Sequence, residues 1–358
     1  MQTNAFLRFI HDYSYPNDFY SFYSAEEETG LNSTGKNNNI LIKDQSFYFL
    51  SGFSAKLIHK TLINSNFIQT NKLDEATLVV GSKSHEDLQK YLKVYQRMTH
   101  YLYTQVIGQK VGLHTTLTKF MYYTGLSLPF YPKTFLIPQQ LEQFKKSVSS
   151  AKFWIEKPSC GSCGRGITIV EGMPEKFITR QVVMQEYIRN PLLIHGYKFD
   201  LRFYVAVTSL NPLRVYNYND GLVRFATEKY ALFFEDVSNL SAHLTNFSIN
   251  KESENFQVTN DVKNDGKGSK WSHVPFWPFL DSLNFDVNNI KEKIDDAIAT
   301  IIFSARNDLA CQSNHRCSFE LYGFDVLLTV DGEIHILEVN ISPALGTPVQ
   351  LGPHPKKE

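Results

Sequence analysis

Two acidic residues near the end of the chain have a spacing that would bring them together in space. Asp325 and Glu338 lie in apolar segments on either side of the dipeptide Asp331-Gly332. Asp-Gly accepts the positive φ angles of a type I′ turn, so we expect residues 319–343 to form a β-hairpin. If this dipeptide is the whole loop, Val330 pairs with Glu333, and counting outward places Asp325 directly opposite Glu338.

This pairing predicts a metal site. Like charges on directly opposed strand positions repel each other, so a cation is expected between Asp325 and Glu338. Asn340 projects from the same face and adds an amide oxygen. Two carboxylates and an amide oxygen suit Mg²⁺, which prefers hard oxygen ligands. The simpler alternative is a solvated face that carries two acids, but the apolar segments around them weaken it.

A glycine-rich loop, residues 159–166, follows an apolar segment that ends in Lys157 and precedes a second apolar segment. Its glycines would let backbone N–H groups approach an anion, so the loop could bind phosphate. The alternative is a plain hairpin turn. It leads into a strand and lacks Gly-Lys-Ser/Thr, which excludes a Walker-type loop. The zinc-like spacing of Cys160 and Cys163 is not repeated by Cys311 and Cys317, so zinc is disfavoured.

A row of charges alternates with apolar residues at the start of the segment 198–207. Period two places Lys198, Asp200 and Arg202 on one face and Phe199, Leu201 and Phe203 on the other. A solvated sheet face would explain this pattern, but two cations separated by an acid could also bind phosphate oxygens. We expect the chain to turn at Asp220-Gly221 and to return with Arg224 near this row.

Further elements are expected to hold these residues. Strands are predicted at 76–80 and at 182–188, the second with backbone groups that a purine could use, and helices at 84–92 and 138–150. Apolar residues at helical spacing in 288–308 predict a helix that covers the sheet. The segment 243–251 is expected to be a polar loop.

Composition restricts the possible partners and location. The chain has 358 residues, of which 42% are hydrophobic, and its 36 basic residues equal its 36 acidic ones. It can therefore bury a large core, and no global charge favours nucleic acid or membrane. Few cysteines, no long apolar run and no signal-like start favour an intracellular protein with reduced thiols.

Taken together, these motifs resemble the tubulin tyrosine ligase-like amino acid ligases, which have the α+β ATP-grasp fold. The resemblance runs from about Leu78 to Leu345 and is carried by motifs in the family's order: Tyr95-Gln-Arg-Met-Thr-His100, Trp154-Ile-Glu-Lys-Pro-Ser159, Lys198-Phe-Asp-Leu-Arg202, Asp220-Gly-Leu-Val-Arg224, His243-Leu-Thr-Asn246 and Glu338-Val-Asn-Ile-Ser-Pro343. Arg214-Val-Tyr and the segment 317–325 look most like the glutamate-adding branch.

The resemblance implies an enzyme that uses ATP to phosphorylate an acceptor carboxylate, which the amine of a free amino acid then attacks. It implies roles for the residues that match the motifs. ATP would be bound by Lys157, Ser159, Gly161, Gly164, Arg165, Gly166, Gln185, Glu186, Tyr187, Ile188, Lys198 and Asp200. Mg²⁺ would be bound by Asp325, Glu338 and Asn340, and the reacting carboxylates would be oriented by Arg202, Arg224, Thr245, Asn246 and Lys251.

The same resemblance implies an organisation, partners and a location. We expect an N-terminal domain over 1–97, a central lobe over 98–188 and a C-terminal lobe over 189–358, with the nucleotide held between the two lobes. The expected partners are free glutamate and the acidic C-terminal tails of tubulin or microtubules, or other acidic proteins, without nucleic acid or membrane. The expected location is the cytoplasm and cytoskeleton, including a cilium, flagellum or basal body.

Alternatives remain open, because the chain departs from the family in two places. The family has Arg-Lys-Asp where this chain has Gln109-Lys110-Val111, which argues against Lys110 as a nucleotide contact. The family also continues with a helix where this chain has a proline-rich end. The alternatives are a glycine-adding or tyrosine-adding ligase of the same family and a catalytically impaired tubulin-binding protein.

Overall fold

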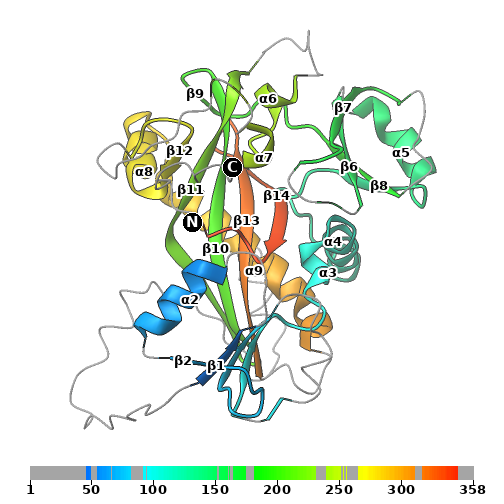
Figure 1. Cartoon of the computed structure of the whole chain (residues 1–358). Helices are drawn as coiled ribbons and strands as arrows, with labels where there is room; N and C mark the ends of the chain where they lie inside the picture. The colour runs from blue at the N-terminus through cyan, green and yellow to red at the C-terminus, as the bar shows by residue number, and fades with distance from the viewer. Residues whose placement is uncertain are drawn as a thin grey trace, which may run out of the picture.

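The long apolar segments of the C-terminal half form the centre of a large sheet (Figure 1). β10 (Tyr197–Leu210) lies between β11 (Leu213–Lys229) and β13 (Ser318–Leu328), and both pairings are antiparallel. The structure is a computed structural model that describes residues 46–49, 55–65, 67–81, 92–93, 95–150, 153–159, 161, 164–174, 181–230, 239–250, 253, 255, 265–310 and 317–345.

Shorter strands extend this sheet on both sides. β12 (Lys270–Ser272) pairs with β11, β9 (Leu193–Ile194) pairs with β10, and β14 (Ile334–Ile341) pairs with β13. The first part of β13 also pairs in parallel with β4, so the N-terminal strands continue the same sheet. These are β4 (Arg97–Thr99), β3 (Leu78–Val80), β1 (Ser46–Phe49) and β2 (Ile68–Thr70).

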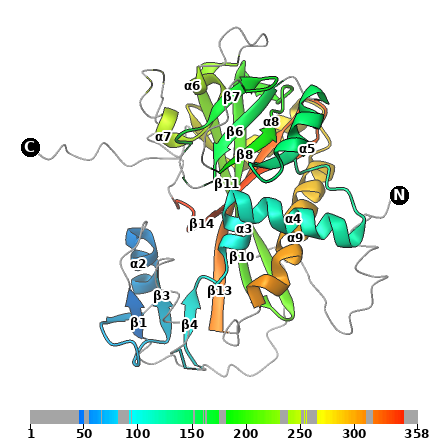
Figure 2. The same cartoon turned by 90° about the vertical axis from the view of Figure 1, so that its right-hand side faces the viewer.

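A second, smaller sheet lies beside the upper half of the large one, on the right in Figure 1 and toward the viewer in Figure 2. Its order is β5-β8-β6-β7, and every pairing is antiparallel. The strands are β5 (Thr134–Ile137), β6 (Phe153–Pro158), β7 (Thr168–Glu171) and β8 (Val182–Glu186). Alternation along β6 turns Trp154 toward Phe144 of α5 (Leu141–Ser147) and leaves Ile155 and Lys157 on the opposite face.

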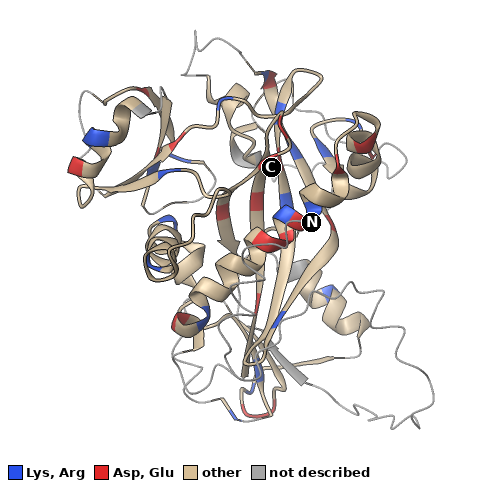
Figure 3. Ribbon diagram, turned by 180° about the vertical axis from the view of Figure 1, so that it is seen from behind, with Lys and Arg blue, Asp and Glu red and all other residues tan. Residues whose placement is uncertain are grey.

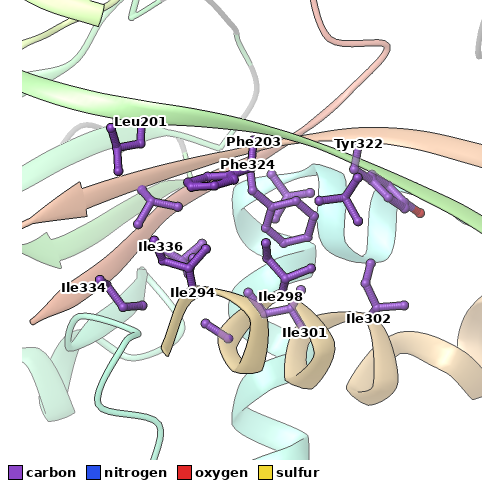
Figure 4. Packing of buried hydrophobic residues seen from close by; sticks show 14 of the residues in the cluster. Leu201, Phe203, Ile294, Ile298, Ile301, Ile302, Tyr322, Phe324, Ile334 and Ile336 are labelled. Atoms are coloured by element: carbon purple, nitrogen blue, oxygen red, sulfur yellow. The ribbon is translucent and has the colours of Figure 1, made fainter. Parts of the chain in front are cut away.

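Helices cover one face of the large sheet and define which face is left for chemistry. α9 (Val287–Ala310) packs its isoleucines on β10, β13 and β14, as Figure 4 shows for Ile294, Ile298 and Phe324. The same core includes residues of α3, α4 and α8. The remaining helical segments are α2 (Ala55–Asn64), α3 (Gln105–Gly108), α4 (Lys110–Thr124), α6 (Leu240–His243), α7 (Phe247–Asn250), α8 (His273–Ser282) and the 3-10 turn η3 (Val148–Ser150).

The β13–β14 hairpin has the predicted pair but not the predicted turn. Asp325 lies opposite Glu338, as predicted. Glu333, however, pairs with Thr329 and not with Val330: Thr329 N donates a backbone hydrogen bond of 2.9 Å to Glu333 O. The loop is therefore one residue longer than a type I′ turn, and within it Gly332 alone takes a positive φ, of 72°.

An extra residue in β14 compensates for the longer loop. The register shifts between Asp325 and Val326, where Val326 pairs with Ile336, so Leu337 is a β-bulge. Ile334 and Ile336 face the core before the bulge, and Val339 and Ile341 face it afterwards. The longer loop and the bulge cancel each other, and this is why Glu338 still meets Asp325.

The predicted turn at Asp220-Gly221 is wrong. The β10–β11 hairpin turns at Asn211-Pro212, and Gly221 lies within β11 opposite Phe203. Glycine is required there by close approach, because a Cβ would lie 2.2 Å from the backbone oxygen of Arg202 and 2.4 Å from the His273 ring. Arg224 nevertheless reaches the predicted row, since it pairs with Asp200.

The structure confirms the α+β class and most of the other expected elements. The predicted strands and the helix that covers the sheet are present, and the helix expected at 138–150 begins at Leu141. The helix expected at 84–92 lies almost wholly outside the described residues, as does the proline-rich end. No helix in the described part of the chain has the length and apolar content needed to span a membrane. The three-part division of the chain stays a prediction.

Candidate active site

Paired charges cross the large sheet on the face away from α9. Strand register places Arg224 opposite Asp200 and Arg202 opposite Asp325. Arg224 donates from Nε to Asp200 Oδ1 at 2.7 Å and also contacts Asp325 Oδ2 at 2.8 Å. Arg202 donates two hydrogen bonds to the Asp325 carboxylate, one from Nε and one of 2.9 Å from Nη2. Figure 3 shows that basic and acidic positions occur on neighbouring strands of the large sheet.

Asp325 contacts both arginines of this row. Burial alone would raise its pKa, but the guanidinium groups of Arg202 and Arg224 hold the pKa well below its usual range. The carboxylate is therefore ionised, and the two arginines supply the positive charge that its position opposite Glu338 requires. The charged face predicted from alternation is thus buried and internally paired.

The predicted metal ligands lie together, and they fit a hard cation only in part. The Asn340 amide nitrogen lies 3.3 Å from Asp325 Oδ2 and 3.2 Å from Glu338 Oε1. Both Asp325 oxygens accept hydrogen bonds from arginine, whereas Glu338 makes no ion pair within 4 Å among the described residues. Glu338 is consequently the donor most available to Mg²⁺, with Asp325 shared with the arginines. Asn340 presents its amide nitrogen to both carboxylates, so its oxygen would bind Mg²⁺ only after the amide group turns.

Two lysines enter this region from different sheets, and both are buried. Lys157 of β6 donates to the Gln185 side chain at 2.7 Å and to the backbone oxygen of Leu337 at 3.4 Å. Lys198 of β10 donates to the Tyr187 hydroxyl at 3.0 Å. Burial lowers the pKa of Lys157 to about 8 and that of Lys198 to about 7, against the opposing effect of nearby acids. An anionic ligand strongly stabilises buried ammonium groups of this kind, because they have lost the hydration that stabilises the charge in water.

The segment 243–246 closes the site from the side of α6 and α7. His243 is buried, and its Nδ1 lies 3.0 Å from the Tyr187 hydroxyl. Asn250 holds the segment in place, because its side chain accepts from Thr227 N at 2.9 Å and donates to Leu244 O at 2.8 Å. The predicted polar loop over 243–251 is wrong for most of its described residues, because α6 ends at His243 and α7 spans Phe247–Asn250, and only residues 244–246 between them are irregular. Asn250 anchors this segment to β11.

Two adjoining cavities lie between the two sheets. The larger, of about 320 Å³, is lined by Lys110, Lys157, Ser159, Gly161, Gln185, Glu338, Asn340 and apolar residues of α3, α4 and β14. The smaller, of about 70 Å³, is lined by residues that include Gln185, Glu186, Tyr187, Ile188, Lys198, Asp200, Thr245, Asn246, Asp325 and Glu338. Lys157, Gln185, Leu337 and Glu338 line both, so the two cavities form one continuous site.

Only some of the residues predicted in the glycine-rich loop 159–166 line this site. Ser159 and Gly161 line the larger cavity, and Gly164 lies against Asn246. Arg165 and Gly166 are exposed and line neither cavity. Lys251 lies outside the described residues.

Sequence reasoning missed several residues that the structure brings to the site. Lys110, set aside because of its unusual neighbours, lines the larger cavity and donates to Gly161 O at 3.1 Å. The Leu337 carbonyl reaches Lys157 from the bulge, and Thr134 accepts from the Gln185 amide at 2.9 Å. A basic residue at the start of a helix could have indicated Lys110, but no sequence signal marks the bulge.

Comparison with known proteins gives the same family as the motifs. Residues 85–357 match the model of the tubulin-tyrosine ligase family. Curated relatives include the human tubulin polyglutamylase TTLL5, 32% identical over 328 residues, and the mouse tubulin monoglutamylase TTLL4, 32% identical over 305 residues. A probable beta-tubulin polyglutamylase of Tetrahymena thermophila is 34% identical over 280 residues.

These alignments cover most of this chain and a small part of each relative. They include 88%, 83% and 74% of this chain, but only 26%, 25% and 23% of the three relatives. The chain thus spans about a quarter of the length of the curated relatives that it matches. The family match extends over the strands that carry the paired charges and over both cavities. The chain therefore belongs to the tubulin-tyrosine ligase family.

Proposed function

We propose that this chain is an ATP- and Mg²⁺-dependent ligase that adds glutamate to glutamate side chains in the acidic C-terminal tails of tubulin. One observation carries the proposal. Basic side chains from both sheets, Lys157 and Lys198, line two adjoining cavities that share Glu338 as a lining residue. Such an arrangement suits phosphoryl transfer, in which catalysis consists mainly of positioning and charge neutralisation.

The nucleotide would lie across the two cavities. When bound, ATP would supply the γ-phosphoryl group that activates the acceptor carboxylate as an acylphosphate, with ADP as the leaving group. The amine of free glutamate would then attack the acyl carbon, and the isopeptide bond would form as the C–O bond to phosphate breaks and inorganic phosphate and a proton are released. Lys157 and Lys198 would bind its phosphates, and the backbone of 185–188, with the apolar side chains of Ile155 and Ile167, would bind its base. Ser159, Gly161 and Lys110 would close the larger cavity over the phosphates.

The metal would be held at the β13–β14 end of the row. Glu338 and Asn340 are its proposed principal ligands, with Asp325 as a shared ligand that keeps its arginine partners. Mg²⁺ commonly binds one or two carboxylates and completes its shell with water and phosphate oxygens, so this incomplete protein shell is sufficient.

Arg202 and Arg224 are proposed to orient the reacting carboxylates. Each already has a carboxylate partner, which holds its guanidinium group in a fixed direction. Thr245 and Asn246 line the smaller cavity beside them and can donate hydrogen bonds. The names of the curated relatives, which are polyglutamylases and a monoglutamylase, support glutamate as the added amino acid.

Mass spectrometry tests this proposal directly. The purified chain is incubated with ATP, Mg²⁺, tubulin and one free amino acid at a time, and the tails are examined for mass increments. We expect additions of glutamate only, lost without ATP or Mg²⁺ and lost with Glu338→Gln. Additions of glycine or tyrosine would establish the corresponding alternative, and binding of tubulin without any addition would identify a non-catalytic protein.

A salt titration tests the acidic-tail part of the proposal. Charges on an exposed tail are screened over about 8 Å at physiological ionic strength, whereas a nucleotide enclosed between two sheets is screened less. The KM for tubulin should therefore rise with salt before the KM for ATP does. Equal modification of a neutral tail peptide would refute the acidic-tail acceptor.

A further inference from the structure

Lys270 is a basic residue that the motifs and the proposed roles leave without a function. It opens β12, the edge strand beyond β11, and is paired in register with Arg224. The next residue, Trp271, is buried in the main core, with its ring centroid 4.9 Å from that of Phe225. Because alternate strand residues point to opposite faces, Lys270 lies on the same face as Arg224 and Asp200.

The position of Lys270 is fixed by the strand pairing. Three consecutive pairs join β12 to β11, and Phe225 N also donates to the backbone oxygen of Ser269 at 3.1 Å. The side chain is half-buried, and burial together with the neighbouring Arg224 lowers its pKa to about 8. A cation held beside another cation is stabilised by an anion that binds to both.

The charged row therefore continues to the edge of the sheet. Glu338 and Asp325 lie at one end, Arg202 and Arg224 at the centre, and Lys270 at the outer end. Lys270 is level with Asp200, and Asp325 with Arg202, two residues further along. With strands about 4.8 Å apart and a rise of about 3.4 Å per residue, the backbone of Lys270 lies roughly 16 Å from that of Asp325. The carboxylate oxygens of free glutamate stay within about 6 Å of its amine, given ordinary bond lengths. An extended peptide covers the longer span in a few residues.

We infer that Lys270 binds an acidic side chain of the acceptor tail that flanks the modified residue. This inference rests on the proposed function, because it presumes that the acceptor carboxylate reacts near Arg202 and Asp325. Lys270 would fix the register of the tail, so that one particular glutamate of an acidic run reaches the reacting position. It is a specificity-determining residue and does not touch the reacting atoms.

Direct peptide binding tests the assignment without any need for turnover. A fluorescein-labelled, glutamate-rich tail peptide is titrated with the wild-type chain and with Lys270→Met, without nucleotide, and anisotropy is recorded. A charged hydrogen bond of this kind predicts an increase in Kd of about tenfold. Lys270→Arg should restore binding, and the exposed neighbour Lys267, changed to Met, is the matched control with unchanged Kd.

A second peptide distinguishes a specific contact from a general loss of charge. In this peptide the flanking glutamates are replaced by glutamine and the acceptor glutamate is kept. If Lys270 binds a flanking carboxylate, the wild-type chain and Lys270→Met should bind it equally. Equal losses with both peptides, or an unchanged Kd for the acidic peptide, would overturn the inference.

Turnover then separates this inference from the proposed function. With the active chain, Lys270→Met should raise the KM for the tail and shift the position of the added glutamate, while the KM for free glutamate and for ATP stays unchanged. A rise in the KM for free glutamate alone would assign Lys270 to the amino acid instead. If the wild-type chain does not ligate at all, the proposed function fails, and the two-peptide comparison still decides the role of Lys270.

Discussion

Asp325 and Glu338 face each other across β13 and β14, and the residue before Glu338 is a bulge whose carbonyl oxygen lies 3.4 Å from the Lys157 ammonium group. The bulge therefore joins the paired acids of the large sheet to a lysine of the small one. The two acids differ in their partners, because arginines hold Asp325 while Glu338 lines both cavities. We therefore propose that Asp325 mainly holds the framework of the site and shares the metal, while Glu338 is the more available metal ligand.

Glu338→Gln should therefore abolish ligation and leave the fold intact. Removing the charge relieves repulsion from Asp325, which is worth about 0.2–1 kcal/mol for directly opposed positions, so the unliganded protein should be as stable as the wild type or slightly more stable. Activity should fall by at least about a hundredfold, as for the loss of one stabilising group in a preorganised site. Initial rates and urea denaturation measure the two effects.

A control for this variant lies in the same hairpin. Glu333 is on the surface, where it pairs with Lys293 at 2.7 Å, and Glu333→Gln should change neither rate nor stability appreciably. Near-normal turnover of Glu338→Gln would refute its role as a metal ligand.

Gly221→Ala should destabilise the protein although only one methyl group is added. The new Cβ would lie 2.2 Å from the Arg202 backbone oxygen and 2.4 Å from the His273 ring, so the two strands must separate. Overpacking of this kind costs about 1–3 kcal/mol, and here it also displaces the backbone that carries Arg202. Urea denaturation should show the loss of stability, and the KM for the acceptor should rise.

Gly172→Ala provides a comparison with a different physical cause. No atom lies within 4 Å of a Cβ at Gly172, but its φ of 63° is unfavourable for alanine. The expected cost is about 1 kcal/mol, from backbone strain alone and without effect on the acceptor KM. Equal effects of the two substitutions on KM would contradict the proposed displacement of Arg202.

Alternation made much of the site predictable. The period-two pattern of residues 198–203 identified the face that carries Lys198, Asp200 and Arg202, because the apolar positions between them had to face a core. It also placed Asp325 and Glu338 on one face. The family motifs then indicated His243-Leu-Thr-Asn246, whose Thr245 and Asn246 line the smaller cavity.

Features that depend on tertiary contacts were not predictable in the same way. The Asp-Gly pairs at 220–221 and 331–332 were both interpreted as turns, yet at Asp220-Gly221 the glycine serves close packing against Arg202 and His273. The Leu337 bulge has no local marker, because leucine is also normal in a regular strand. The contact of Lys110 with Gly161 joins elements distant in sequence and was hidden by the altered neighbours of Lys110.

The buried ion-pair network predicts a large penalty when one partner is removed. Arg224→Met would leave Asp200 without its cross-strand partner and Asp325 with Arg202 alone. Removing one partner of a buried ion pair costs about 3–5 kcal/mol, because a charge stays buried without compensation. Adding Asp200→Asn to Arg224→Met should recover part of this loss. Urea denaturation of the single and double variants tests the coupling, and strictly additive losses would contradict it.

The pH dependence of stability should reveal Lys198. Its pKa falls from 10.5 to about 7 on folding, because burial outweighs the attraction of Asp200, while Lys157 opposes its charge further. The Tyr187 and Tyr230 rings, at 4.6 and 5.9 Å from its nitrogen, complete its surroundings. The unfolded chain therefore binds more protons than the folded one between about pH 7 and pH 10, and stability rises with pH across this window, by up to about 1.4 kcal/mol per pH unit.

Lys198→Met should remove this contribution. Without nucleotide, the substitution should stabilise the protein most near pH 7, where the buried ammonium group is costly, and progressively less toward pH 10. The affinity for ATP should fall as pH rises, whereas stability rises. The wild type should bind ATP more weakly above about pH 7, because Lys198 must then take up a proton when ATP binds. Urea denaturation and nucleotide titration across this range measure both effects. A stability difference that is constant with pH would show that Lys198 keeps its ordinary pKa in the folded protein.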